Sequence, residues 1–100
     1  MGRERLDGKL LQDAYILLQP ARYRIVKLLA EQPMHISALS TAMGIASRIV
    51  AFHLRTLEDF GFVKCKYEIS DDPKTRWKAL RLCTVTDKVA DVIAELKRAL

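Results

Sequence analysis

Residues 36–63 constrain the fold more than any other part of the chain, because they place two glycines where helices should end. Gly44 follows a short helix-forming run, and a tight turn favours glycine because its backbone tolerates positive φ. Gly61 suits the C′ position of a second helix. We expect Ser37 to cap the first helix. Apolar residues at i, i+4 and i+7 define the buried face of the second, and they are Val50, Leu54 and Leu57.

The opposite face of this second helix carries the residues that indicate a function. Two helices joined by a tight turn over residues 36–60 form a helix-turn-helix, whose second helix enters the DNA major groove. Arg48 and Arg55 lie opposite the buried stripe, and arginine pairs with guanine or clamps phosphate. Phe52 shares their face. It is expected to contact thymine methyl groups, a partner protein or a neighbouring helix.

The remaining patterns extend this motif into one domain spanning residues 1–100. Helices are expected over residues 7–18, 20–31 and 86–100, with Arg22, Arg24 and Lys27 pointing outward from the second. Alternating residues predict a two-stranded β-hairpin over residues 62–85, with a turn at 70–76. The expected fold is α+β and mostly helical, with about five helices and one hairpin.

The first helix is apolar nearly all round, which indicates burial on more than one side. In so short a chain, a second copy is the simplest cover, although a central core helix is the alternative. The last helix carries a clean apolar stripe and is the second candidate for a homodimer interface. The expected interface residues are Leu10, Leu11, Tyr15, Leu18, Val89, Ile93, Leu96 and Leu100.

Composition excludes several other classes. The formal net charge of +5 favours an anionic partner. The chain shows neither a signal peptide nor an apolar run that would span a bilayer, so we expect a cytoplasmic protein with no membrane partner. Cys65 and Cys83 are too few for a zinc site, and buried inert thiols are favoured over a redox switch in the hairpin. His53 is expected to be structural. No metal, cofactor or catalytic constellation is indicated, so we expect no enzyme.

Three segments, in order, resemble the ArsR-type (arsenic-repressor-like) winged helix-turn-helix regulators. LQPARYRIVKLLAEQP is similar to the family's entry helix, ISALSTAMGIASRIVAFHLRTLEDFGFV to its helix-turn-helix, and PKTRWKALRLCTVTDKV to its wing and following helix. Residues 38–43 lack the cysteine pair of the family's metal sensors, so metal sensing at that site does not carry over. Positions 49, 51 and 52 are apolar, which makes this recognition helix less polar than is usual in the family.

The resemblance implies a homodimeric transcriptional regulator that binds double-stranded DNA sequence-specifically. The second helix of the motif would occupy the major groove, and the wing would contact the backbone or minor groove. The alternative is a winged-helix module for protein–protein interaction that uses the apolar recognition face. The expected DNA-binding residues are Ser37, Ser47, Arg48, Ile49, Ala51, Phe52, Arg55, Lys74, Thr75 and Arg76.

Overall fold

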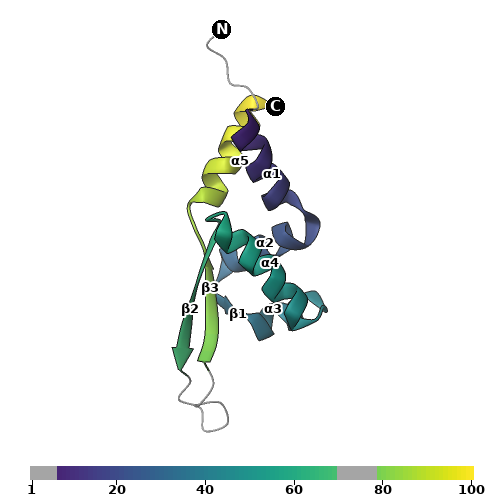
Figure 1. Cartoon of the computed structure of the whole chain (residues 1–100), viewed down its shortest axis with the longest axis vertical. Helices are drawn as coiled ribbons and strands as arrows, with labels where there is room; N and C mark the ends of the chain where they lie inside the picture. The colour runs from purple at the N-terminus through teal and green to yellow at the C-terminus, as the bar shows by residue number, and fades with distance from the viewer. Residues whose placement is uncertain (1–6, 70–78) are drawn as a thin grey trace.

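The computed structural model describes residues 7–69 and 79–100. Figure 1 shows α1 and α5 packed together at one end, the β2–β3 hairpin extending toward the other, and α2, α3 and α4 beside the hairpin. This mostly helical α+β arrangement confirms the predicted winged helix-turn-helix fold. The elements are α1 (Gly8–Leu18), α2 (Pro20–Glu31), β1 (Met34–His35), α3 (Ile36–Met43), α4 (Ser47–Asp59), β2 (Val63–Ile69), β3 (Ala79–Val85) and α5 (Lys88–Ala99).

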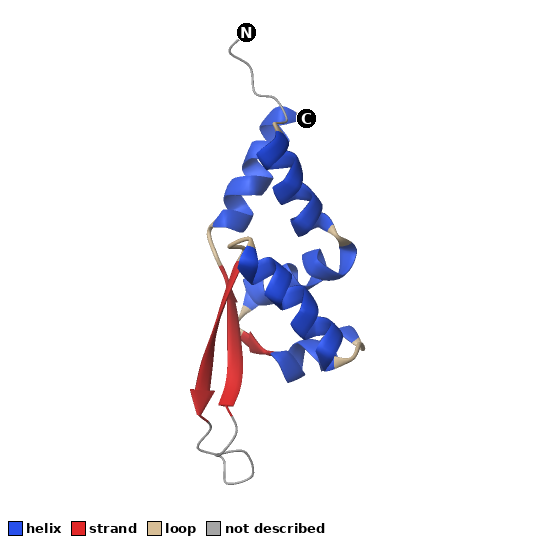
Figure 2. Ribbon diagram, viewed as in Figure 1, coloured by secondary structure: helices blue, strands red, loops and turns tan. Residues whose placement is uncertain are grey.

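The sheet has three antiparallel strands in the order β1-β3-β2, not the two strands predicted from the sequence (Figure 2). The sequence prediction missed β1, which contains only two residues and pairs Met34 with Cys83 and His35 with Leu82. In the hairpin, Val63 faces Val85 at the base. The short strand therefore joins the start of α3 to the same sheet that forms the wing.

One residue separates the first two helices. Gln19 ends α1 and caps α2, where its side-chain oxygen accepts a hydrogen bond from the Arg22 backbone N–H at 2.9 Å. Pro20 follows at the first helical position, which it suits because its fixed φ is already helical. The Arg22 side chain was predicted to point outward, and this was wrong. It is buried, and its Nε donates to the Ile16 carbonyl at 2.5 Å.

The core confirms the predicted buried face of α4. Val50, Leu54 and Leu57 are fully buried. They join residues of every helix and of both hairpin strands in one apolar cluster, which makes the orientation of α4 a property of the whole domain. Other members that are at most 3 % exposed are Leu17, Ile25, Val26, Leu29, Leu39, Phe62, Val63, Cys83 and Val92.

Lys88 links three helices of the domain, α5, α1 and α4. Its ammonium group donates to the Phe60 carbonyl at 2.6 Å, lies 3.2 Å from a carboxylate oxygen of Asp13, and sits 4.7 Å from the centre of the Phe62 ring. Asp13 belongs to α1, and Phe60 caps the C-terminus of α4. One side chain of α5 thus joins α1 to the end of the recognition helix.

Candidate nucleic-acid interface

The turn between α3 and α4 is built around Gly44 and Ser40. Gly44 has a φ of +68°, and its N–H donates to the Ser40 carbonyl at 2.9 Å. The Ser40 hydroxyl donates to the Ile45 carbonyl at 2.5 Å. These bonds close the turn, and the two helices meet at 114°. The geometry is that of a helix-turn-helix with α4 in the recognition position.

The beginnings of α3 and α4 face a shallow cavity beside the half of the hairpin that lies away from its base. Ser37 was predicted to cap α3, and this was wrong: His35 occupies the N-cap position, and no side chain makes a capping bond. Ser37 instead lies exposed in the first turn, while Ser47 begins α4. Both line a cavity of about 380 Å³, whose other lining residues are His35, Ile36, Tyr67, Leu80 and Arg81.

The outer face of α4 presents both charged and apolar side chains to solvent. Arg48 and Arg55 are exposed. They stand seven residues, or about 10 Å of helix, apart. Phe52 is 62 % exposed and Ile49 is 43 % exposed, while Ala51 is half-buried. This face suits a groove that offers phosphates at its edges and thymine methyl groups on its floor.

His53 lies on the inner flank of the same helix. It is buried, and its Nδ1 is 3.5 Å from the Arg22 guanidinium. Burial lowers the pKa of the imidazole, and the positive charge of Arg22 lowers that pKa further. Its ring also meets the Phe52 ring edge-on, with the centroids 5.4 Å apart. His53 therefore packs as a neutral histidine behind the exposed face.

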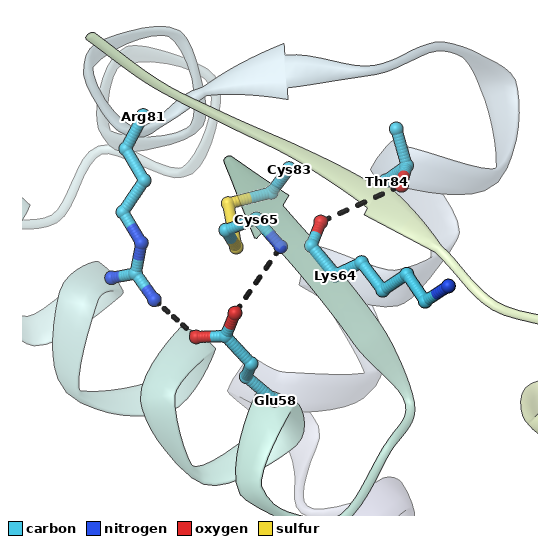
Figure 3. Close-up of a disulfide and its surroundings, with 6 residues drawn as sticks. All are labelled: Glu58, Lys64, Cys65, Arg81, Cys83 and Thr84. Atoms are coloured by element: carbon cyan, nitrogen blue, oxygen red, sulfur yellow. Dashed lines mark hydrogen bonds and ion pairs between the residues drawn. A yellow bond between two sulfur atoms is a disulfide. The ribbon is translucent and has the colours of Figure 1, made fainter. Parts of the chain in front are cut away.

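Glu58 fastens the recognition helix to the wing, and sequence reasoning missed it. The Glu58 carboxylate forms an ion pair with Arg81 of β3 and accepts a hydrogen bond from the Cys65 backbone N–H of β2 at 3.3 Å (Figure 3). A second cross-link joins His35 of β1 to Glu68 of β2 at 3.1 Å. The wing strands are thus held against the helix-turn-helix by side chains from both of its flanks.

Residues 19–64 match the sequence model of the bacterial regulatory proteins of the arsR family. The chain carries an ArsR-family helix-turn-helix domain. The family and its structural neighbours are transcriptional regulators rather than enzymes, which agrees with the expectation from the sequence. No curated protein matches the chain.

Solved structures support the same fold. An ArsR family transcriptional regulator superposes with a TM-score of 0.68 at 18 % identity, over 90 % of this chain and 84 % of that one. A transcriptional regulator homologue from Pyrococcus horikoshii OT3 gives 0.66 at 23 % identity, over 89 % and 91 %. A transcriptional regulator from Thermotoga maritima gives 0.62 at 29 % identity, over 90 % and 59 %. Fold and family together support a DNA-binding regulator.

Not every predicted site residue falls within the described part of this ArsR-family domain. The predicted DNA-binding residues of the wing tip, Lys74, Thr75 and Arg76, lie outside the described residues. Among residues 7–69 and 79–100, no cluster of three or more His, Cys, Asp or Glu side chains is arranged to hold a metal ion. No single helix in those ranges is long and apolar enough to cross a membrane. Only α3 and α4 taken together would pass by length and composition, and they are sharply bent at the turn.

The cysteines differ from the expectation of inert thiols. Cys65 and Cys83 face each other across β2 and β3 and form a disulfide bond, with their Cα atoms 4.0 Å apart. Cys83 is fully buried, whereas Cys65 is half-buried. The pairing follows from the register of the hairpin, which the alternation of residues did not determine.

The predicted dimer residues of the domain fall into two groups. Leu10, Val89 and Leu96 are buried inside the chain, where α1 packs on α5, and Ile93 is half-buried. The exposed group lies mainly on the other side of α1, where a shallow groove of about 520 Å³ also includes Ala14, Gln19 and Pro20. Its large members are Leu11 at 50 %, Tyr15 at 76 % and Leu18 at 48 % exposed; Leu100 is 86 % exposed at the end of the chain.

Proposed function

We propose that this protein is a cytoplasmic transcriptional regulator that binds specific double-stranded DNA as a homodimer. Each α4 would occupy a major groove, and each wing would contact the backbone or the minor groove. The observation that carries the proposal is the outer face of α4, where Arg48 and Arg55 are exposed on a helix whose opposite face is fixed in the core. The ArsR-family match over this motif supports it.

Arginine removal tests the DNA contact. Arg48→Ala and Arg55→Ala should each weaken binding to duplexes selected from a random pool, by about 1–3 kcal/mol where the arginine reads a base. A phosphate contact should instead lower the slope of log affinity against log salt by about one. Arg98→Ala removes the same charge from the exposed face of α5 and serves as the control. Fluorescence anisotropy at several salt concentrations measures both quantities. Equal affinity of the wild type and the double variant at ~150 mM salt would refute the assignment.

The dimer surface is proposed to lie on α1. Leu11, Tyr15 and Leu18 form an exposed apolar surface on a chain of only 100 residues, and single domains of this size gain stability from burying such surface against a partner. Tyr15→Glu should convert the dimer to a monomer in sedimentation velocity. Gln12→Glu introduces the same charge at an exposed position of the same helix and should leave the dimer intact. A wild-type protein that sediments as a monomer would contradict the proposal.

The apolar part of the recognition face favours a second candidate, a protein-interaction module anchored by Phe52. The two candidates predict opposite results for Phe52→Arg. A DNA-binding face that uses Phe52 for thymine contact should lose sequence preference in this variant. A protein-binding face would show no retention of the wild type on a DNA column and improved retention of the variant.

A further inference from the structure

A cavity of about 360 Å³ opens beside the hairpin, and Cys65, which is disulfide-bonded to Cys83, lies at its wall. Cys65 lines this cavity and is half-buried, whereas Cys83 is fully buried in the core. A small molecule that enters from solvent therefore meets Cys65 first. The other lining residues are Glu58, Lys64, Lys66, Leu82 and Thr84.

The charges around the cavity favour an anion. Lys64 and Lys66 flank Cys65 in β2, line the same cavity and are exposed, so the cavity carries positive charge. The carboxylate of Glu58 is already engaged by Arg81 and by a backbone N–H (Figure 3). The nearby side chains thus carry an excess of positive charge, which raises the local concentration of small anions.

We propose that Cys65 and Cys83 form a thiol–disulfide exchange site for small anionic thiols, and that its redox state sets the DNA affinity of the wing. In the first step, the thiolate of the small molecule attacks the Cys65 sulfur. A new sulfur–sulfur bond forms, and Cys83 leaves as a thiolate. A second small thiolate attacks the mixed disulfide on its outer sulfur and releases Cys65 as a thiolate. The two cysteine thiolates take up protons, and two small thiols become one small disulfide.

The connection to DNA binding rests on the proposed function. Glu58 of the recognition helix holds β2 through the Cys65 N–H and holds β3 through Arg81. The disulfide joins the two strands at the first of these attachments, so in the oxidised state both strands are held as one covalent unit. Reduction removes this covalent link and leaves the strand ladder and the contacts of Glu58. A less ordered wing loses more conformational freedom on binding, so reduced protein should bind DNA more weakly.

The chemical part of the proposal is tested by exchange rates. The oxidised protein is incubated with 2-mercaptoethanesulfonate, which is anionic, or with 2-mercaptoethanol, which is neutral, and disulfide opening is followed by mass spectrometry after acid quenching. Each rate is divided by the rate of the same thiol toward a small neutral disulfide. The anionic thiol should show a relative rate about 3- to 10-fold higher, because one or two nearby positive charges act on it through a largely aqueous medium. The paired substitution Lys64→Gln and Lys66→Gln should remove this preference, and Lys27→Gln on α2 should retain it.

Two results would overturn the exchange site. Equal relative rates for the two thiols would show that the lysines do not select an anion. A disulfide that opens only under conditions that unfold the protein, as followed by circular dichroism, would be a purely structural cross-link.

The regulatory part is tested with a duplex selected by the oxidised protein. Reduction should lower its affinity by about 3- to 10-fold, a modest effect for a change in wing order alone. Cys65→Ser should bind as the reduced wild type does, with or without thiol. Equal affinity of the oxidised and reduced wild type would refute the control of DNA binding. An oxidised protein that exchanges normally but binds no duplex would instead refute the proposed function and leave the exchange site standing.

Discussion

Lys88→Met should destabilise the domain far more than its position near the surface indicates. The substitution removes a charge-assisted hydrogen bond of 2.6 Å to the Phe60 carbonyl, and such bonds contribute about 1.5–3 kcal/mol. It also leaves Asp13, whose side chain is 9 % exposed, without its nearer cation. Breaking a fully buried ion pair costs about 3–5 kcal/mol. Here the cost is smaller, because Lys9 remains 3.6 Å from Asp13 and the Lys88 side chain is 30 % exposed.

Together these contributions give an expected loss of about 2–4 kcal/mol in the free energy of unfolding. For a domain of this size, the thermal midpoint should fall by about 10–25 °C. The assay is urea unfolding followed by circular dichroism, with thermal unfolding as a second measure. All variants are compared at one protein concentration, because dimerisation would stabilise the folded state by mass action.

Lys97→Met is the matched control, since Lys97 is exposed in the last turn of the same helix. It should change the free energy of unfolding by less than about 0.5 kcal/mol. A double variant, Asp13→Asn with Lys88→Met, should lose less than the sum of the two single variants, because it leaves no unpaired charge at the buried position 13. The reasoning fails if Lys88→Met is as stable as Lys97→Met, or if the two single losses simply add.

Two further predictions concern the recognition helix. Because the pKa of His53 lies below its ordinary value of 6.5, the unfolded chain takes up a proton first as the pH falls. The stabilisation is therefore complete above about pH 6.5 and decreases as the pH falls below that value. Urea unfolding should show that His53→Gln removes this part of the pH dependence, and an unchanged profile would contradict the assignment. Gly61→Ala places a side chain at a φ of +81°, which L residues rarely adopt. It should lower the free energy of unfolding by about 1–2 kcal/mol, as measured by thermal unfolding. Gly8→Ala at the start of α1, where nothing lies within 4 Å, is its control, and equal stability of the two variants would argue against a conformational cause.

Local spacing was sufficient to predict the recognition helix and its two faces. Val50, Leu54 and Leu57 recur at the helical period, so the projection that placed them inside also placed Arg48 and Phe52 outside. Helix ends could be read where a residue has a strong conformational preference, as at Pro20, Gly44 and Gly61. In each case, the residues that predict the face or the end of the helix lie within about one or two helical turns of one another in the sequence.

The errors arose where a partner distant in sequence decides the outcome. β1 contains two residues and is a strand only because β3 lies beside it, so no local alternation marks it. Arg22 is charged and was placed outside, but the break between α1 and α2 leaves the Ile16 carbonyl available as its acceptor. The disulfide and the attachment of Glu58 to Arg81 depend on hairpin register and on helix–sheet packing. None of these leaves a periodic signal.

The single-residue joint at Gln19 has a consequence for the DNA sites that such a dimer would accept. Gln19 ends one helix and caps the next, while the Arg22 side chain bridges back to Ile16 across the corner. These contacts fix the angle between α1 and α2, so the joint does not act as a hinge. In the proposed dimer, α1 pairs the subunits, and the recognition helix α4 packs against α2. The fixed angle between α1 and α2 would therefore set the distance between the two recognition helices. Operators with an inserted base pair between half-sites would then be rejected sharply, because Gln19 alone separates α1 from α2 and this joint cannot follow the change in spacing.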